Sequence, residues 1–307
     1  MVTRAAALAA LGALAAAPAP GFAQTAATVK IGSGSVEANA QGFYALDAGF
    51  FKKGGVDVDL TILHSGPAIA AAVIGGDLNV GVSNVISLAS AKLRGIPLTL
   101  IAPGAIFDAK DATEQMVVLR DGPIRSAKDL NGRVVGGQSI GSTAQLAILA
   151  WIDKNGGDAS SVKYVEVPPA ASLAALQQGR IFAAALQDPE LSAAGDNVRT
   201  LGRAYEAIAK RYVLAAWFAM DDWLAKNRDL GRRVADALDQ AGVWAMANPV
   251  PAAAIFEKYT KVHLGRAGEQ FAPKLDAAMF QPIFDSATKY KLLTAPLDAS
   301  AILWNGA

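Results

Sequence analysis

Residues 56–84 read VDVDLTILHSGPAIAAAVIGGDLNVGVSN, and this stretch decides the fold. From Val56 to Ile62 apolar and polar residues alternate, as in a strand with one solvated face. Ser65-Gly66-Pro67 then predicts a helix start, with a capping hydroxyl and a proline in the first turn. A buried strand is expected at Leu78 to Val82, and Ser83-Asn84 opens the next helix. A strand that leads directly into a helix directs free backbone N–H groups into a crevice, where small molecules bind.

The alternation of strands and helices extends over residues 29–104 and restarts between residues 116 and 186. Parallel sheets with right-handed crossovers are the expected result. Phe43, Leu46 and Phe50 indicate one face of a single helix. Tyr212 to Met220 is expected to form one strand, and the chain beyond it has a helical pattern. Later helices are expected around residues 252–261, 267–280 and 283–291.

The first 23 residues have the three regions of a secretory signal peptide. Arg4 supplies the positive charge, Ala5 to Ala17 form the apolar segment, and Gly21-Phe22-Ala23 carries small residues at the cleavage positions. We expect cleavage after Ala23 and a mature periplasmic chain that begins at Gln24. The alternative is an uncleaved alanine-rich anchor, but the apolar run is too short to span a bilayer.

Composition excludes several classes of function. The chain has no cysteine, which removes disulfides, thiol nucleophiles and thiolate metal sites. Its net charge is +1 and it has no basic tract, so we expect no nucleic-acid partner. His64 and His263 are the only histidines and lack metal-ligand spacing, so we expect neither a metal nor a cofactor.

Polar residues at three predicted helix starts are candidates for ligand binding. Ser65, Ser83 and Ser142 each occupy such a position, with Asn84 and Thr143 beside them. These side chains either cap their helices only or also contact a ligand, since the two roles are compatible.

Asp188 is a sixth candidate because it follows the apolar run Ile181 to Leu186. A carboxylate at the end of a buried strand is costly unless it is paired or used, so we expect it to be partly desolvated and to face a cleft. The alternative is a turn-forming aspartate before Pro189.

Several ordered stretches resemble the periplasmic solute-binding proteins of ABC importers, in the group for nitrate, alkanesulfonates, taurine and thiamine-pyrimidine precursors. They cover most of the chain after the signal peptide. The matching segments are residues 42–51 (GFYALDAGFF), 54–58 (GGVDV), 71–82, 128–134 (KDLNGRV), 141–142, 174–176 with Gly179, and 188–189.

The resemblance implies an α/β, two-lobed periplasmic binding protein fold of type II, with a discontinuous first lobe and two hinge crossovers. Lobe 1 would comprise residues 28–103 and 213–307, and lobe 2 residues 106–211. The expected function is a periplasmic, monomeric receptor that captures a small-molecule solute between the lobes. Its partner would be the ABC importer permease in the inner membrane.

The solute is expected to be a small polar organic molecule, such as a sulfonate, a taurine-like compound or a pyrimidine-like compound. Helix N-termini favour anionic groups and Asp188 favours an amine or hydroxyl donor, so a zwitterion or a neutral molecule with donors fits both. Two alternatives remain open: a lyase-type enzyme on the same fold, and a periplasmic sensor subunit.

Overall fold

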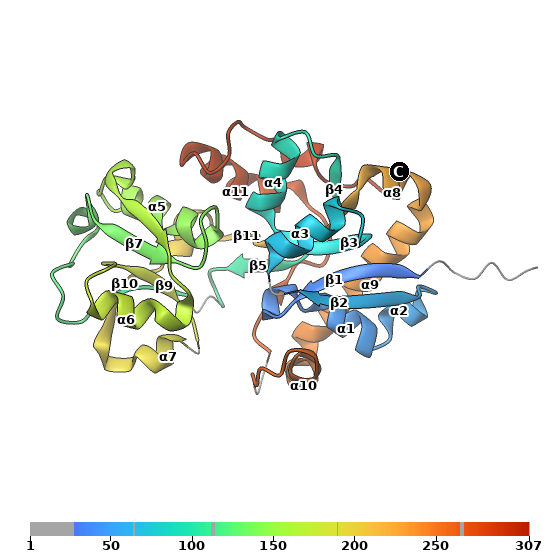
Figure 1. Cartoon of the computed structure of the whole chain (residues 1–307), viewed down its shortest axis with the longest axis horizontal. Coiled ribbons are helices and arrows are strands. Elements are labelled where there is room, and N and C mark those ends of the chain that lie inside the picture. Colours follow the sequence, from blue (N-terminus) through green and yellow to red (C-terminus); the bar gives the residue numbers. More distant parts are fainter. Residues whose placement is uncertain (1–27, 64, 112–113, 189, 265–266, 307) are drawn as a thin grey trace, which may run out of the picture.

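The computed structural model describes residues 28–63, 65–111, 114–188, 190–264 and 267–306. The expected signal peptide therefore lies outside the described residues. The chain forms two α/β lobes, each built on a five-stranded sheet, and a three-stranded sheet lies between them (Figure 1). None of the helices among the described residues is long and apolar enough to cross a membrane.

The elements follow one another in a mixed α/β order. The strands are β1 (Val29–Gly34), β2 (Val58–Leu63), β3 (Val80–Asn84), β4 (Leu98–Pro103), β5 (Ala105–Asp108), β6 (Gln115–Leu119), β7 (Val134–Gly137), β8 (Lys163–Glu166), β9 (Ala184–Leu186), β10 (Val198–Gly202), β11 (Arg211–Val213), β12 (Ala215–Met220) and β13 (Gln270–Phe271). The α-helices are α1 (Gln41–Asp47), α2 (Phe50–Lys53), α3 (Gly66–Ile74), α4 (Val85–Leu93), α5 (Thr143–Lys154), α6 (Ser172–Gln177), α7 (Glu190–Ala194), α8 (Asp221–Lys226), α9 (Arg228–Ala247), α10 (Pro249–Thr260) and α11 (Ala277–Lys289). Short 3-10 helices are η1 (Glu37–Asn39), η2 (Ala127–Leu130), η3 (Ala159–Ser161), η4 (Pro169–Ala171), η5 (Gly195–Asn197), η6 (Ala204–Ala207) and η7 (Ala299–Ala301).

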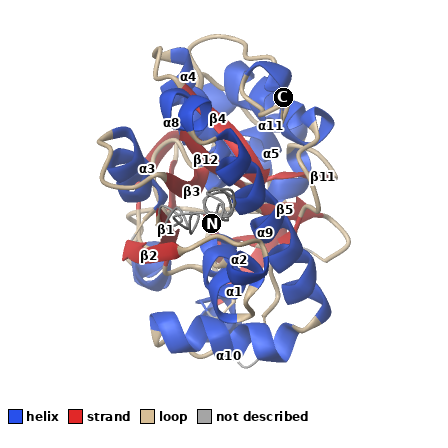
Figure 2. Cartoon of the chain, turned by 90° about the vertical axis from the view of Figure 1, so that its right-hand side faces the viewer, coloured by secondary structure: helices blue, strands red, loops and turns tan. Residues whose placement is uncertain are grey.

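The first sheet has the order β2-β1-β3-β12-β4, with helices on both of its faces (Figure 2). β2 is an edge strand of this sheet and was predicted as a strand with one solvated face. β1 pairs in parallel with β2 and β3, but β12 runs antiparallel to β3 and β4. The parallel pairing expected within residues 29–104 is confirmed for β1, β2 and β3, and β12 adds an antiparallel strand because the chain returns to this lobe from the opposite direction. Within residues 116–186 the parallel expectation was wrong for β6, which pairs antiparallel with β9.

The second sheet has the order β10-β6-β9-β7-β8. β7 is parallel to β8 and β9, whereas β6 is antiparallel to β9 and β10. Separate apolar clusters pack around this sheet, one including Ile148 and the other Leu176. The second lobe is thus also a mixed sheet covered by helices.

Two strands connect the lobes. β5 carries the chain from the first sheet toward the second, β11 carries it back, and the two pair antiparallel in one sheet with β13. The single strand expected from Tyr212 to Met220 is therefore two strands in different sheets. The chain leaves one sheet at Leu214 and enters the other at Ala215.

Two helix expectations also needed correction. The helix expected through Phe43 and Phe50 is divided into α1 and α2 at Gly49, whose φ of 81° is left-handed. The two helices expected over 267–280 and 283–291 are instead β13 followed by the single helix α11. Pro282 lies inside α11, where the buried Phe280, Ile283 and Phe284 outweigh one lost backbone hydrogen bond.

Candidate functional site

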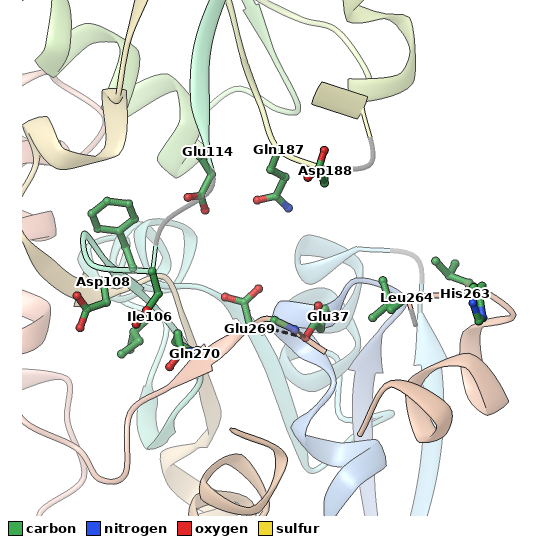
Figure 3. Close-up of a pocket in the computed structure, with 14 residues that line it drawn as sticks. Glu37, Ile106, Asp108, Glu114, Gln187, Asp188, His263, Leu264, Glu269 and Gln270 are labelled. Atoms are coloured by element: carbon green, nitrogen blue, oxygen red, sulfur yellow. Dashed lines mark hydrogen bonds between the residues drawn. The ribbon is translucent and has the colours of Figure 1, made fainter. Parts of the chain in front are cut away.

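A cleft lies between the two lobes, beside the strands that connect them. It consists of two hollows of about 340 and 360 Å³ that share part of their walls. Lobe 1 contributes the segment after β1 and the segment before β13, and lobe 2 contributes the ends of β6 and β9. Figure 3 shows Glu114, Gln187 and Asp188 on one side and Glu37, Glu269 and Gln270 on the other. This volume fits a small molecule.

Glu37 is held by a hydrogen-bonded link between distant parts of the chain. It begins η1 directly after β1, and its Oε1 accepts the backbone N–H groups of Gly268 and Glu269 at 2.7 and 2.8 Å. Burial raises the pKa of Glu37, and these two hydrogen bonds oppose that effect. The carboxylate is thereby fixed at the wall of the cleft.

Glu269 lies beside Glu37, immediately before β13. Its side chain is half-buried. Burial, followed by the negative charges of Glu37 and Glu114, raises the pKa of Glu269 to about 8. Glu114 belongs to lobe 2, so carboxylates from both lobes act on the same small volume (Figure 3).

Tyr44, in α1, is within electrostatic reach of this pair of glutamates. The side chain is fully buried, and its hydroxyl has no hydrogen-bond partner among the described residues. The ring packs edge-on against Phe271, with 6.2 Å between ring centroids. Burial and the charges of Glu37 and Glu269 raise the pKa of Tyr44 well above its usual range. The hydroxyl is therefore a neutral, unused donor within electrostatic reach of both carboxylates.

Aromatic rings of the hinge support the other end of the cleft. Tyr205, in η6, lines the cleft and stacks on Phe107 of β5 with 5.8 Å between ring centroids. Phe107 also packs against the buried Tyr212, whose hydroxyl donates to the Tyr205 carbonyl at 3.1 Å. The rings join the hinge strands to the wall of the cleft.

The lining is strongly acidic. None of its described residues is lysine or arginine. Arg211 forms an ion pair with one lining carboxylate, that of Asp108, at 3.3 Å. Among the described lining residues, one imidazole is present, that of His263, which is exposed and bonded to Glu257 at 2.7 Å. The carboxylates that line the cleft are Glu37, Asp108, Asp111, Glu114, Asp188, Glu190 and Glu269.

Among the six predicted site residues, Asp188 is the one that lines the cleft. The prediction that it is partly desolvated was wrong, because its side chain is exposed. One of its oxygens accepts the Ser192 N–H at 3.0 Å and also the Ser192 hydroxyl. β9 ends at Leu186, so Asp188 lies beyond the buried strand, at the start of α7.

Ser65 and Ser142 cap the helices α3 and α5, as predicted. Ser65 accepts the Ala68 N–H, and Ser142 accepts the Gln145 N–H, both at 3.3 Å. Asn84, not Ser83, caps α4 through the Ser87 N–H at 2.9 Å.

Ser83 is fully buried, and its hydroxyl faces Gly66 at the start of α3. Thr143 is buried in the first turn of α5. None of these five residues is part of the cleft lining, and a role for them in ligand contact stays a prediction.

Sequence reasoning missed Glu37, Glu114, Gln187 and Glu269. One signal pointed to Glu37, since it follows the carboxyl end of a predicted strand as Ser65 and Ser83 do. Glu269 gave no such signal, because its place depends on β13 pairing with β5. Trp217 of β12 is fully buried, and its indole N–H donates to Gln41 at 2.8 Å. The described residues contain no cluster of potential metal ligands.

A sequence model described as NMT1/THI5 like matches residues 38–252. The chain belongs to the NMT1/THI5-like family. No curated protein matches the sequence. Among solved structures, the periplasmic aliphatic sulphonate binding protein SsuA from Escherichia coli shares 21% identity, with a TM-score of 0.69 over 91% of this chain and 92% of that one.

Two further solved structures have the same fold. The periplasmic nitrate-binding protein NrtA from Synechocystis PCC 6803 shares 15% identity, with a TM-score of 0.69 over 91% of this chain and 85% of that one. The desulfurization enzyme DSZB shares 17% identity, with a TM-score of 0.63 over 90% of this chain and 96% of that one. The two-lobed fold implied by the resemblance is thus confirmed.

Proposed function

We propose that this member of the NMT1/THI5-like family is the periplasmic solute-binding component of an ABC importer. The observation that carries the proposal is the cleft, a cavity whose polar walls come from both lobes and which lies against the strands that connect them. A small molecule held there contacts both lobes at once, so its binding energy favours the closed arrangement.

The names of similar structures support this role. SsuA is named as a sulphonate-binding protein and NrtA as a nitrate-binding protein, both periplasmic. The signal-peptide pattern in residues 1–23 agrees with export, and cleavage after Ala23 is part of the proposal. A permease in the inner membrane and a monomeric receptor complete it.

The lobes are proposed to comprise residues 28–103 with 213–307, and residues 106–211. The short strands β5 and β11 would then act as the hinge. Changes in φ and ψ at a few residues of such connections are sufficient for domain closure. Gly104 lies at one crossing and donates to the Ala215 carbonyl at 2.8 Å, which ties the two crossings together.

An enzymatic role is the second candidate because DSZB shares the fold. The absence of cysteine removes a thiol nucleophile from this chain. The glutamates of the cleft are candidates for acid–base chemistry, and Glu269 has the raised pKa that such chemistry uses. Turnover of a bound solute, detected by mass spectrometry after prolonged incubation, would favour the enzyme over the receptor.

A thermal-shift screen of the mature protein tests the proposed function. The compounds are sulfonates, nitrate, amino-pyrimidines, amino acids and small amines. A solute at about 100 times its dissociation constant stabilises the protein by about 2.7 kcal/mol, which the assay detects. At least one compound should raise the melting temperature. A screen in which nothing binds would contradict a receptor function.

A further inference from the structure

The glutamate pair of lobe 1, Glu37 and Glu269, is the most unusual feature of the cleft. Two carboxylates side by side repel each other, and partial burial strengthens the repulsion. The Glu37 carboxylate accepts the backbone N–H groups of Gly268 and Glu269, and these two hydrogen bonds hold it next to Glu269. The chain therefore holds the two carboxyl groups together by backbone bonding, and ionisation of both costs stability unless a ligand compensates the charge.

Tyr44 is fully buried, and its hydroxyl has no hydrogen-bond partner among the described residues. The carboxylates of Glu37 and Glu269 are the charged groups that act on it. Tyr44 itself lines neither hollow, so the carboxylates are the groups that a ligand in the cleft meets.

Carboxylates of lobe 2 face the glutamate pair from the other side of the cleft. Glu114 acts electrostatically on Glu269, and Asp188 lies on the same side of the cleft as Glu114 (Figure 3). When the lobes close, these negative charges approach those of the pair. A positive charge between them converts that repulsion into attraction, so closure and cation binding favour each other.

On these grounds we propose that the cleft selects a solute with a cationic amine or guanidinium group, held between Glu37 and Glu269 of lobe 1 and the acidic wall of lobe 2. This inference rests on the proposed receptor function and specifies its substrate class. A solute of this class differs from nitrate and simple sulfonates, which carry only negative charge. The five helix-start residues that could favour an anion do not line the cleft.

Proton release is a signature of this mode of binding. Because the pKa of Glu269 is raised to about 8, the empty protein keeps a proton on the pair near pH 7. A cation beside the carboxylate lowers that pKa and releases up to one proton, whereas an anion raises it and causes proton uptake. The described titratable groups that act on Glu269 or are acted on by it are Glu37, Tyr44, Glu114 and Tyr205. The rest of the described wall contributes Asp108, Asp111, Asp188, Glu190 and His263.

Isothermal titration calorimetry on the mature protein tests the proposal. The probes are agmatine, putrescine and benzylamine, against nitrate, ethanesulfonate and benzenesulfonate. Each is titrated at pH 7.0 in two buffers of different ionisation enthalpy, which gives the number of protons released. We expect at least one amine to bind with proton release and no anion to bind comparably.

Variants then assign the binding to the pair. Glu269→Gln and Glu37→Gln should each weaken amine binding by about 10- to 150-fold, the effect of losing a charge-assisted hydrogen bond. Asp77→Asn is the matched control, since it removes one negative charge from an exposed turn before β3 that does not line the cleft. The control should bind the amine as the wild type does. Circular dichroism of each variant shows whether the fold is retained.

The outcomes separate the inference from the function on which it rests. Binding of an anion in preference to every amine, or amine binding that survives both glutamine variants, overturns the inference and leaves the receptor function standing. A lack of binding by all three amines also overturns it. Failure of every compound in the broader thermal-shift screen overturns the receptor function as well.

Discussion

Replacing Glu269 by glutamine should stabilise the empty protein at alkaline pH. The pKa of Glu269 is raised from its ordinary value of 4.5 to about 8, mainly by burial. Between these two values the folded protein keeps a proton that the unfolded chain has lost. Stability therefore falls as the pH rises through this window, and the full penalty is present above pH 8. A neutral amide has no such penalty.

The magnitude follows from the size of the shift. A difference of about 3.5 pH units corresponds to at most about 5 kcal/mol, at 1.36 kcal/mol for each unit. Solvent reaches the half-buried carboxylate, which reduces the expected gain to roughly 2 kcal/mol. For a chain of this length, that raises the melting temperature by about 5 °C.

Thermal unfolding of the ligand-free wild type and Glu269→Gln should be compared at pH 5.0 and pH 8.5. We expect the variant to be more stable at pH 8.5 and equal to the wild type at pH 5.0. Asp239, whose pKa burial also raises to about 8, is present in both proteins, so its contribution cancels. A difference between variant and wild type that is the same at both pH values would refute the reasoning, as would a less stable variant at pH 8.5.

Three other predictions follow from the cleft, the hinge and the first residues. Asp188→Asn should weaken amine binding by less than tenfold, because the side chain is exposed and an asparagine can still accept from Ser192; calorimetry showing a larger loss than Glu269→Gln would be inconsistent with this ranking. Gly104→Ala should destabilise the protein by about 1–3 kcal/mol, because an added Cβ would lie 2.7 Å from the Ala215 carbonyl oxygen; urea unfolding at an unchanged midpoint would argue against it. The exported protein should begin at Gln24, and an intact mass that retains Arg4 would contradict cleavage after Ala23.

Local patterns predicted most elements of the fold. The alternation from Val56 to Ile62 correctly indicated a strand, and Ser65-Gly66-Pro67 correctly predicted a helix start. These features depend on neighbouring residues alone. The antiparallel course of β12 and the division at Leu214 depend on the direction in which a distant segment returns, which no local pattern encodes.

The site was less predictable for the same reason. Asp188 was found because it follows an apolar run, but its exposure depends on where β9 ends and on the hydrogen bonds of Ser192. Glu37 and Glu269 are 232 positions apart and meet through backbone bonds to the segment before β13. Pairing of this kind becomes visible only when the chain has folded.

The distance between the lobes provides the most direct test of the central claim, that the protein closes around a cationic solute. The chain has no cysteine, so Ile140→Cys and Val250→Cys create the only two labelling sites, both highly exposed and one in each proposed lobe. Double electron–electron resonance then measures the spin–spin distance with and without the tightest-binding amine of the calorimetric series. We predict that a saturating amine shifts the distribution to shorter distances and that ethanesulfonate does not. An identical distribution in the empty and amine-saturated protein would contradict closure around a cation.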